Sequence, residues 1–231
     1  MHWRYEVSGV DSVTLHFAER IDVALVEPIQ QATQALRQQL GSRLLDAVPS
    51  YTSVLLRYDL LTDDLASLMA DVAAVLNNLA PTAAEERAAQ IIEIPVWYDE
   101  QVGPDLPRIA KRAGLSQQAA IELHTSQSYL VYAIGFAPGF AYLGEVPEQL
   151  AAPRLATPRA KVAAGSLGIA DTQTALYPLV SPGGWNLIGR TPLILFDPQR
   201  EPASLLQAGQ LVKFRAIDFA EYRALGGQLD D

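Results

Sequence analysis

Glycine and proline are distributed very unevenly along this chain of 231 residues. Residues 1–90 contain two of its 15 glycines and three of its 15 prolines, and all the others follow. Because both residue types mark turns, a region poor in them favours long regular elements, and a region rich in them favours short strands joined by turns. The sequence therefore predicts two domains of different architecture, residues 1–90 and residues 91–231.

Hydrophobic periodicity in the first domain switches between strand-like and helix-like segments in a repeated order. Alternating apolar and polar residues predict strands, and apolar residues along one helical face predict helices. The predicted strands cover residues 4–9, 12–18, 44–50 and 52–59, and the predicted helices cover residues 22–40 and a segment after Thr62. This ββαββα order indicates an α+β domain of two layers, with helices on one face of a small antiparallel sheet.

The second domain begins with a strand-like segment, IIEIPVWYD, and continues with a predicted helical hairpin near residues 105–124. The spacing of this hairpin imitates a DNA-binding helix-turn-helix motif, but its second helix carries Glu122 and no lysine or arginine. The formal net charge of −9 also opposes binding to nucleic acid. From residue 126 onward, short apolar runs between prolines and glycines predict a β-barrel or sandwich.

Residues 181–191, SPGGWNLIGRT, resemble a phosphate-binding P-loop in the spacing of Gly184 and Gly189. A P-loop joins a strand to a helix, whereas the next segment, TPLILFDP, is strand-like, and Arg190 replaces the usual lysine. We therefore interpret Gly183 and Gly184 as a tight turn before a strand. Such a turn can still present backbone amides to an anion.

Positive charge is concentrated in the segment between residues 149 and 196. Its charged residues are four cations and one acid: Arg154, Arg159, Lys161, Arg190 and Asp171. Arg154 and Arg159 each follow a proline, which restricts the backbone and helps to aim a guanidinium at a carboxylate or phosphate. The alternative is that these cations neutralise acids of the other domain or remain solvated on loops.

His124 is the last of three histidines and ends the predicted helical hairpin. Its position suits a general base, although a histidine at a helix C-terminus is also explained by the helix dipole. The chain has no cysteine, no serine in a nucleophile elbow and no cluster with metal-ligand spacing, so we expect no metal site.

The N-terminal sequence lacks the apolar core of a signal peptide, because charges occur at Arg4, Glu6 and Asp11. Residues 125–144 carry no charge, but Gly135, Pro138 and Gly139 make a membrane-spanning helix a poor interpretation. We therefore expect a cytoplasmic protein without a membrane partner.

A long stretch of the second domain resembles the 5-oxoprolinase B-subunit family. The stretch is IGFAPGFAYLGEVPEQLAAPRLATPRAKVAAGSLGIADTQTALYPLVSPGGWNLIGRTPLILFD, and the upstream EIPVWYDEQVGPDLPRIAKRAGLS and ELH match as well. The first domain agrees in length and order, so the resemblance covers essentially the whole chain. It implies an N-terminal α+β domain and a C-terminal cyclophilin-like β-barrel.

The resemblance also implies a function. Members act with a paralogous, cyclophilin-like C-subunit and with an A-subunit to open 5-oxo-L-proline, a lactam, to L-glutamate with ATP hydrolysis. ATP would be a co-substrate, with Mg²⁺ expected in the complex, and the isolated chain would be inactive. Two alternatives within the resemblance are a regulatory inhibitor of a sensor histidine kinase and a component of an allophanate hydrolase-like enzyme.

Finally, the resemblance carries over individual residues. It implies catalytic roles for His124, Arg154 and Arg159. It implies substrate or ATP binding by Phe136, Pro138, Gly139, Tyr142, Gln173, Tyr177, Gly183, Gly184, Trp185, Arg190 and Thr191. The positive charge of the segment adds Lys161 to this predicted set.

Overall fold

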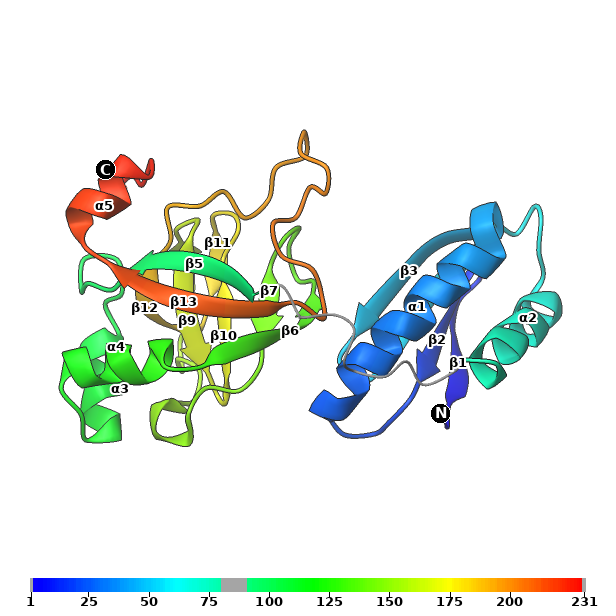
Figure 1. Ribbon diagram of the computed structural model, residues 1–231, viewed down its shortest axis with the longest axis horizontal. Helices are drawn as coiled ribbons and strands as arrows, with labels where there is room; N and C mark the ends of the chain where they lie inside the picture. Colours follow the sequence, from blue (N-terminus) through cyan, green and yellow to red (C-terminus); the bar gives the residue numbers. More distant parts are fainter. Residues whose placement is uncertain (1, 80–90, 230–231) are drawn as a thin grey trace. The chain divides into compact units, whose positions relative to one another are not determined.

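A computed structural model describes residues 2–79 and 91–229 of the chain (Figure 1). The chain divides into two compact units, residues 1–88 and 89–231, and each is described by itself. The domain boundary that the sequence predicts, after residue 90, falls at the edge of a segment outside the described residues and stays a prediction.

The N-terminal unit is a two-layer α+β domain, as predicted. Its sheet has the order β1-β2-β4-β3, and all three neighbouring pairs are antiparallel. The strands are β1 (Arg4–Gly9), β2 (Ser12–His16), β3 (Leu44–Ser50) and β4 (Ser53–Tyr58), and the helices are α1 (Val26–Leu40) and α2 (Leu65–Asn77), with the short 3-10 turns η1 (Val23–Leu25) and η2 (Gly41–Arg43).

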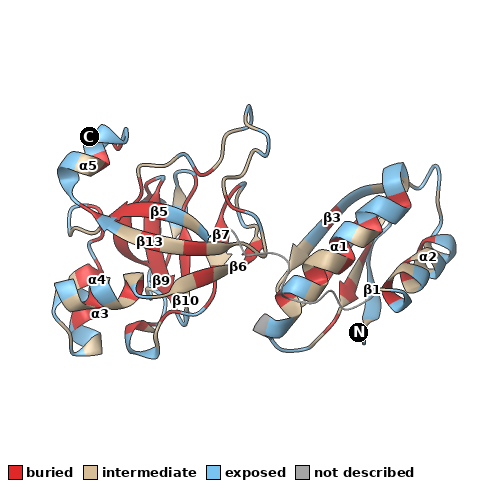
Figure 2. Ribbon diagram, in the orientation of Figure 1, coloured by how far each residue is buried: buried red, intermediate tan, exposed pale blue. Residues whose placement is uncertain are grey.

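One face of this sheet packs against both helices. Strand register places Val13, Leu56 and Ala47 in one row, and all three are buried with Leu36 of α1 and Leu68 of α2. Burying a leucine side chain contributes about 1.5–3 kcal/mol, so the apolar stripes of the two helices determine which face they cover. Figure 2 shows buried positions along only one side of α1 and α2.

The C-terminal unit contains a closed β-barrel. Among residues 91–229, seven strands follow the order β6-β13-β5-β12-β9-β10-β7, and β7 pairs with β6 to close the barrel. The strands are β5 (Ile91–Trp97), β6 (Ser128–Ile134), β7 (Ala141–Leu143), β9 (Ser166–Ala170), β10 (Gln173–Leu176), β12 (Asn186–Arg190) and β13 (Leu211–Ile217). The pair β13–β5 is parallel, and the other pairs are antiparallel.

Further elements surround this barrel. A separate two-stranded ribbon consists of β8 (Arg159–Val162) and β11 (Ser181–Gly183). The helices are α3 (Leu106–Ala113), α4 (Gln117–Thr125) and α5 (Phe219–Ala224), with the 3-10 turn η3 (Glu148–Leu150). Gly114 ends α3 with φ +70°, and the Ser116 hydroxyl accepts from the Ala119 amide at the start of α4, so local sequence explains this helical pair.

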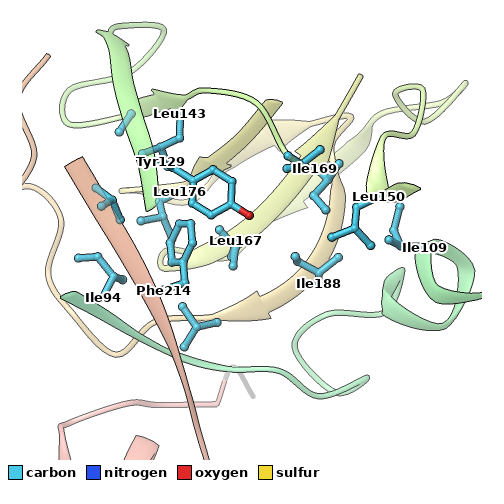
Figure 3. Packing of buried hydrophobic residues seen from close by; sticks show 14 of the residues in the cluster. Ile94, Ile109, Tyr129, Leu143, Leu150, Leu167, Ile169, Leu176, Ile188 and Phe214 are labelled. Carbon is cyan, nitrogen blue, oxygen red and sulfur yellow. The ribbon is translucent and has the colours of Figure 1, made fainter. Parts of the chain in front are cut away.

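The barrel interior is filled by aliphatic and aromatic side chains. Figure 3 shows Leu143, Leu167 and Leu176 converging with Tyr129 and Phe214. The rings of Tyr129 and Phe214 have centroids 5.4 Å apart. Because these side chains pack against one another, the barrel interior is a packed core.

One close backbone contact joins the segment before α3 to the barrel. A Cβ atom on Gly103 would lie 2.2 Å from the carbonyl carbon of Ile188 in β12. Two residues later, the Asp105 amide donates to the Leu187 carbonyl over 2.9 Å. Glycine at position 103 therefore allows α3 to begin directly against β12.

We expect Gly103→Ala to destabilise the protein by about 1–3 kcal/mol, because the added methyl group must displace backbone atoms of β12. Gly135→Ala is the matched control, since a Cβ atom there meets nothing within 4 Å. Urea unfolding followed by circular dichroism measures both variants. Equal stability of the two variants would contradict the close contact.

Candidate functional site

Many of the predicted binding residues lie on the outer face of the barrel. Cross-strand register places Tyr142, Ala175, Gly168 and Leu187 in one row across β7, β10, β9 and β12. Leu143, Leu167 and Leu176, their neighbours along the strands, belong to the interior cluster instead. Since strand residues alternate between faces, the row of Tyr142 points outward.

Aromatic rings gather on this outer face, which we call the aromatic face. They are Phe140, Tyr142, Tyr177 and Trp185, with Phe136 at the edge. Ring centroids are 4.8 Å apart for Phe140 and Tyr142, and 5.1 Å apart for Phe140 and Tyr177. A Cβ atom on Gly168 would lie 3.0 Å from Trp185 Cβ, so a small residue in β9 lets the indole approach the barrel.

Arg154 lies over this aromatic face. Its guanidinium carbon is 6.0 Å from the centroid of the Trp185 ring, which is cation–π geometry. Burial raises the pKa of Tyr142 and Tyr177, and the charge of Arg154 acts in the opposite direction on both. Both phenols are therefore protonated at neutral pH and can donate hydrogen bonds.

Arg159 is fixed by two contacts at the start of β8. Its Nη2 lies 2.9 Å from Asp105 Oδ2, and its Nη1 donates to the Trp185 carbonyl over 3.4 Å. The Arg159 side chain remains 28% exposed, whereas that of Asp105 is 10% exposed. Lys161 is exposed two residues further along β8, so strand alternation places it on the same side of the ribbon as Arg159.

The glycine turn packs next to the same cluster. Gly183 pairs with Arg159 across the ribbon, and a Cβ atom on Gly183 would lie 2.2 Å from the Tyr177 hydroxyl oxygen. The Gly184 carbonyl accepts from the Leu155 amide over 2.7 Å. Residues 181–183 and 186–190 form strands on either side of the turn, so this segment is not the strand-loop-helix unit of a P-loop.

Residues 135–140 form the loop between β6 and β7. Phe136 has φ +69°, an unusual value for a bulky residue, and its side chain is 66% exposed with an edge contact to Phe140. Pro138 precedes Gly139, which has φ +80° and lies against Phe196. This loop therefore presents an aromatic ring to solvent beside the aromatic face.

Three further predicted binding residues lie at or next to the ends of strands β12 and β10. Arg190 is 8% exposed, and its Nη1 donates to the Gln228 carbonyl over 3.4 Å. Thr191 follows it and accepts from the Leu193 amide through its hydroxyl. Gln173 pairs with the last residue of β9, whereas Arg190 pairs with the first, so these two residues lie at opposite ends of that strand.

His124 lies in the interior of the barrel. Its Nδ1 is 3.0 Å from the Tyr98 hydroxyl, and its Nε2 is 3.3 Å from the Thr174 hydroxyl. Its ring packs against Tyr129 and Phe214 with centroids 5.1 Å and 5.0 Å away. Burial lowers the pKa of His124 to about 3, so the ring is neutral at physiological pH.

A small cavity of about 10 Å³ adjoins His124. Tyr98, Leu106 and Ile169 are among the residues that line it. This volume is at the lower limit for one water molecule. The structure thus places His124 among interior residues, whereas Arg154 and Arg159 lie at the aromatic face. A role for His124 in proton transfer stays a prediction.

Sequence reasoning missed Asp105, Tyr98 and Thr174. Asp105 was visible only as the first residue of a predicted helical segment. Tyr98 and Thr174 gave no sequence signal, because they meet His124 across 26 and 50 residues of chain. Contacts of this kind follow from the packing of α4 against the barrel and cannot be derived from local periodicity.

Neither a metal cluster nor a membrane-spanning helix is found among the described residues. No group of three or more histidine, aspartate or glutamate side chains there is arranged to hold a metal ion. Within the same residues, no helix combines the length and apolar character needed to cross a membrane.

The chain combines an α+β unit with a unit built on a closed seven-stranded β-barrel, and a known class of proteins shares this combination. Residues 3–206 match the family described as carboxyltransferase domain, subdomain C and D. The chain is 38% identical to the 5-oxoprolinase B-subunit of Bacillus subtilis over 96% of both proteins. It is 42% identical to the 5-oxoprolinase B-subunit of Escherichia coli, over 82% of this chain and 88% of that protein. The chain belongs to the 5-oxoprolinase B-subunit family.

A solved structure agrees with this assignment. The crystal structure of TTHA0988 superposes with a TM-score of 0.79 at 39% identity and matches 90% of this chain. The matched region is 40% of the TTHA0988 chain, so this chain spans less than half of that protein. The names of the Bacillus subtilis and Escherichia coli relatives describe subunits, which implies that those proteins have partner chains.

The buried, neutral His124 predicts a dependence of stability on pH. The unfolded chain takes up a proton near the ordinary pKa of 6.5, while the folded state resists protonation down to about 3. The stabilisation is therefore complete above pH 6.5 and is lost as the pH falls. Between pH 7 and pH 5, His124 should cost about 2 kcal/mol of the free energy of unfolding.

Urea unfolding at the two pH values measures this loss. His124→Asn should reduce the pH dependence, whereas His2→Asn, at an exposed position, should leave it unchanged. The same pH dependence in wild type and His124→Asn would contradict the assignment.

Proposed function

We propose that this chain is the B-subunit of an ATP-dependent 5-oxoprolinase that opens 5-oxo-L-proline to L-glutamate together with an A-subunit and a C-subunit. The observation that carries the proposal is the arginine pair at the aromatic face. Arg159 pairs with Asp105 and Arg154 lies over Trp185, while the Arg154 side chain is exposed and that of Arg159 is 28% exposed. Similarity to the B-subunit of Bacillus subtilis over 96% of both chains supports it.

The chemistry explains why a cationic surface is needed. An unstrained lactam reacts slowly with water, so its amide oxygen must first be phosphorylated to make the carbonyl carbon electrophilic. Transfer of the γ-phosphoryl group of ATP to that oxygen gives ADP and an imidate phosphate. Water then adds to the same carbon, the ring C–N bond breaks with nitrogen leaving as the amine, and a second water releases phosphate and leaves glutamate.

This sequence develops negative charge on phosphoryl and carboxylate oxygens. Charge-assisted hydrogen bonds from fixed guanidinium groups stabilise such charge more strongly than neutral donors do. Arg159, Arg154 and Lys161 would bind these oxygens, and the Gly183-Gly184 turn would add backbone amides. Tyr142 and Tyr177, protonated at neutral pH, would orient the substrate.

ATP and Mg²⁺ enter this proposal as co-substrate and counter-ion. The described residues hold no acidic cluster for a metal, so Mg²⁺ would arrive on the phosphates of ATP and complete its ligands from those oxygens, water and a partner chain. The aromatic face is an outer surface, and the C-subunit would cover it and exclude water. This need for a second chain is why we expect the isolated protein to be inactive, and ATP supply fits a cytoplasmic location.

We expect glutamate release from 5-oxoproline and ATP only when all three chains are present. The measurement is an omission series, in which the A-, B- and C-subunits are left out in turn and glutamate and ADP are quantified. Release without this chain would disprove its role as an obligatory component. A complex that assembles but is inactive would redirect the proposal to another amide, such as allophanate. Failure to assemble would redirect it to inhibition of histidine kinase autophosphorylation.

Arg154→Ala tests the cationic surface directly. Because Arg154 is exposed and contacts Trp185 through its ring face, its removal should leave folding intact. We expect kcat/KM of the assembled complex to fall by about 10²-fold through loss of an oxyanion-stabilising donor.

Arg57→Ala is the matched control for Arg154→Ala. Arg57 is an exposed arginine of the N-terminal unit that pairs with Asp11. Its replacement should leave kcat/KM within about twofold, because exposed ion pairs contribute little. Equal effects of the two substitutions would remove Arg154 from the site.

A further inference from the structure

Three helices within residues 2–79 and 91–229 begin at an aspartate, and one of these aspartates behaves differently. Asp64 and Asp218 accept from the amide three residues later and so cap α2 and α5. Asp105 precedes α3 but makes no such hydrogen bond, and its backbone is helical. Pro107 in the first turn of α3 removes one of the amides that a cap would serve.

The Asp105 carboxylate faces the barrel instead of its own helix. Its Oδ2 accepts from the Leu187 amide over 2.8 Å and lies 2.9 Å from Arg159 Nη2. The Asp105 amide in turn donates to the Leu187 carbonyl over 2.9 Å. A reciprocal pair of hydrogen bonds to β12 thus fixes this carboxylate in the barrel wall.

The close contact of Gly103 with β12 fixes the same segment from its other side. The carboxylate therefore cannot follow Arg159 if that side chain moves. An isolated exposed arginine loses rotamer entropy when it binds a ligand. Arg159 has already lost much of this freedom to Asp105 and to the Trp185 carbonyl.

We infer that Asp105 is a positioning residue, which holds the Arg159 guanidinium in the orientation needed to bind an anionic phosphoryl or carboxylate group. Arg159 pairs with Asp105 through Nη2 and donates to the Trp185 carbonyl through Nη1, and 28% of its side chain remains exposed. The ion pair with Asp105 sets the direction in which the guanidinium N–H groups of Arg159 point. The identity of the anion rests on the proposed function, but the orientation of Arg159 does not.

Asp105→Asn isolates this role. The asparagine side-chain oxygen can still accept from the Leu187 amide, so the anchor to β12 persists while the negative charge beside Arg159 is lost. Asp11→Asn is the matched control, because it removes a carboxylate at 2.8 Å from Arg57 in an exposed ion pair.

The first readout needs no substrate. Phenylglyoxal modifies accessible arginines, and mass spectrometry of peptides follows each site in the isolated chain. We expect Asp105→Asn to speed modification of Arg159 by about threefold or more, because the ion pair no longer restrains the side chain. Modification of Arg154 should not change. An unchanged rate at Arg159 would overturn the inference.

The second readout is a double-mutant cycle in the assembled complex. Asp105→Asn should lower kcat for glutamate release by about tenfold in the wild-type background, because a misaligned donor loses transition-state binding. It should cause no further loss in an Arg159→Ala background, since the residue it orients is absent. An equal loss in both backgrounds would show a merely structural role and would overturn the inference.

The two readouts separate this inference from the proposed function. If the wild-type complex releases no glutamate, the proposed function fails, and the modification rate of Arg159 still decides the role of Asp105. If the complex is active and the rate is unchanged, the positioning role fails alone.

Discussion

Close packing on both faces of β9 is the constraint on which the C-terminal unit depends. Every residue of β9 is buried, although it is one strand of a barrel only a single layer thick. Leu167 and Ile169 fill the interior, while Gly168 and Ala170 face outward beneath aromatic side chains. Glycine and alanine leave the space that Trp185 occupies. Strand β9 is thus a fully buried wall of the barrel, with the interior cluster on one face and the aromatic face on the other.

This wall separates the ionisable groups into two environments. On the inner side, desolvation holds His124 neutral among Tyr98, Tyr129 and Phe214. On the outer side, the cations keep access to solvent, and Arg159 is paired with a largely buried carboxylate. Proton transfer from His124 to a ligand at the aromatic face would have to cross the wall. The outer surface is therefore suited to electrostatic binding by arginine rather than to acid-base chemistry by histidine.

The sequence was informative where a feature of the chain is local. Periodicity predicts the strands and helices of the N-terminal unit, and the predicted strand directly after the Gly183-Gly184 turn is confirmed as β12. The prediction of a strand over TPLILFDP is wrong, because residues 191–198 form only an isolated bridge at Phe196 and no strand, but they form no helix either, so the argument against a P-loop holds. It was uninformative where tertiary pairing decides the outcome. Asp105 is a residue type that commonly caps helices, so the sequence predicts a cap. Only the approach of β12 turns its carboxylate toward Arg159. Likewise, a four-cation segment predicts one cluster, but strand register sends Arg190 toward the C-terminal segment.

Phe136 shows why this surface is better understood as part of a larger site. A bulky residue at φ +69° costs on the order of 1–3 kcal/mol, and its exposed ring adds an apolar surface in contact with water. Packing within the described residues offsets little of either cost, because the contact with Phe140 is made at one edge only. Both are offset if the ring packs against another molecule at the aromatic face. The proposed function adds a similar requirement, since phosphoryl transfer at Arg154 and Arg159 would need water to be excluded. Under the proposed function, a partner chain that covers the aromatic face would account both for the strain at Phe136 and for the exposure of the cations.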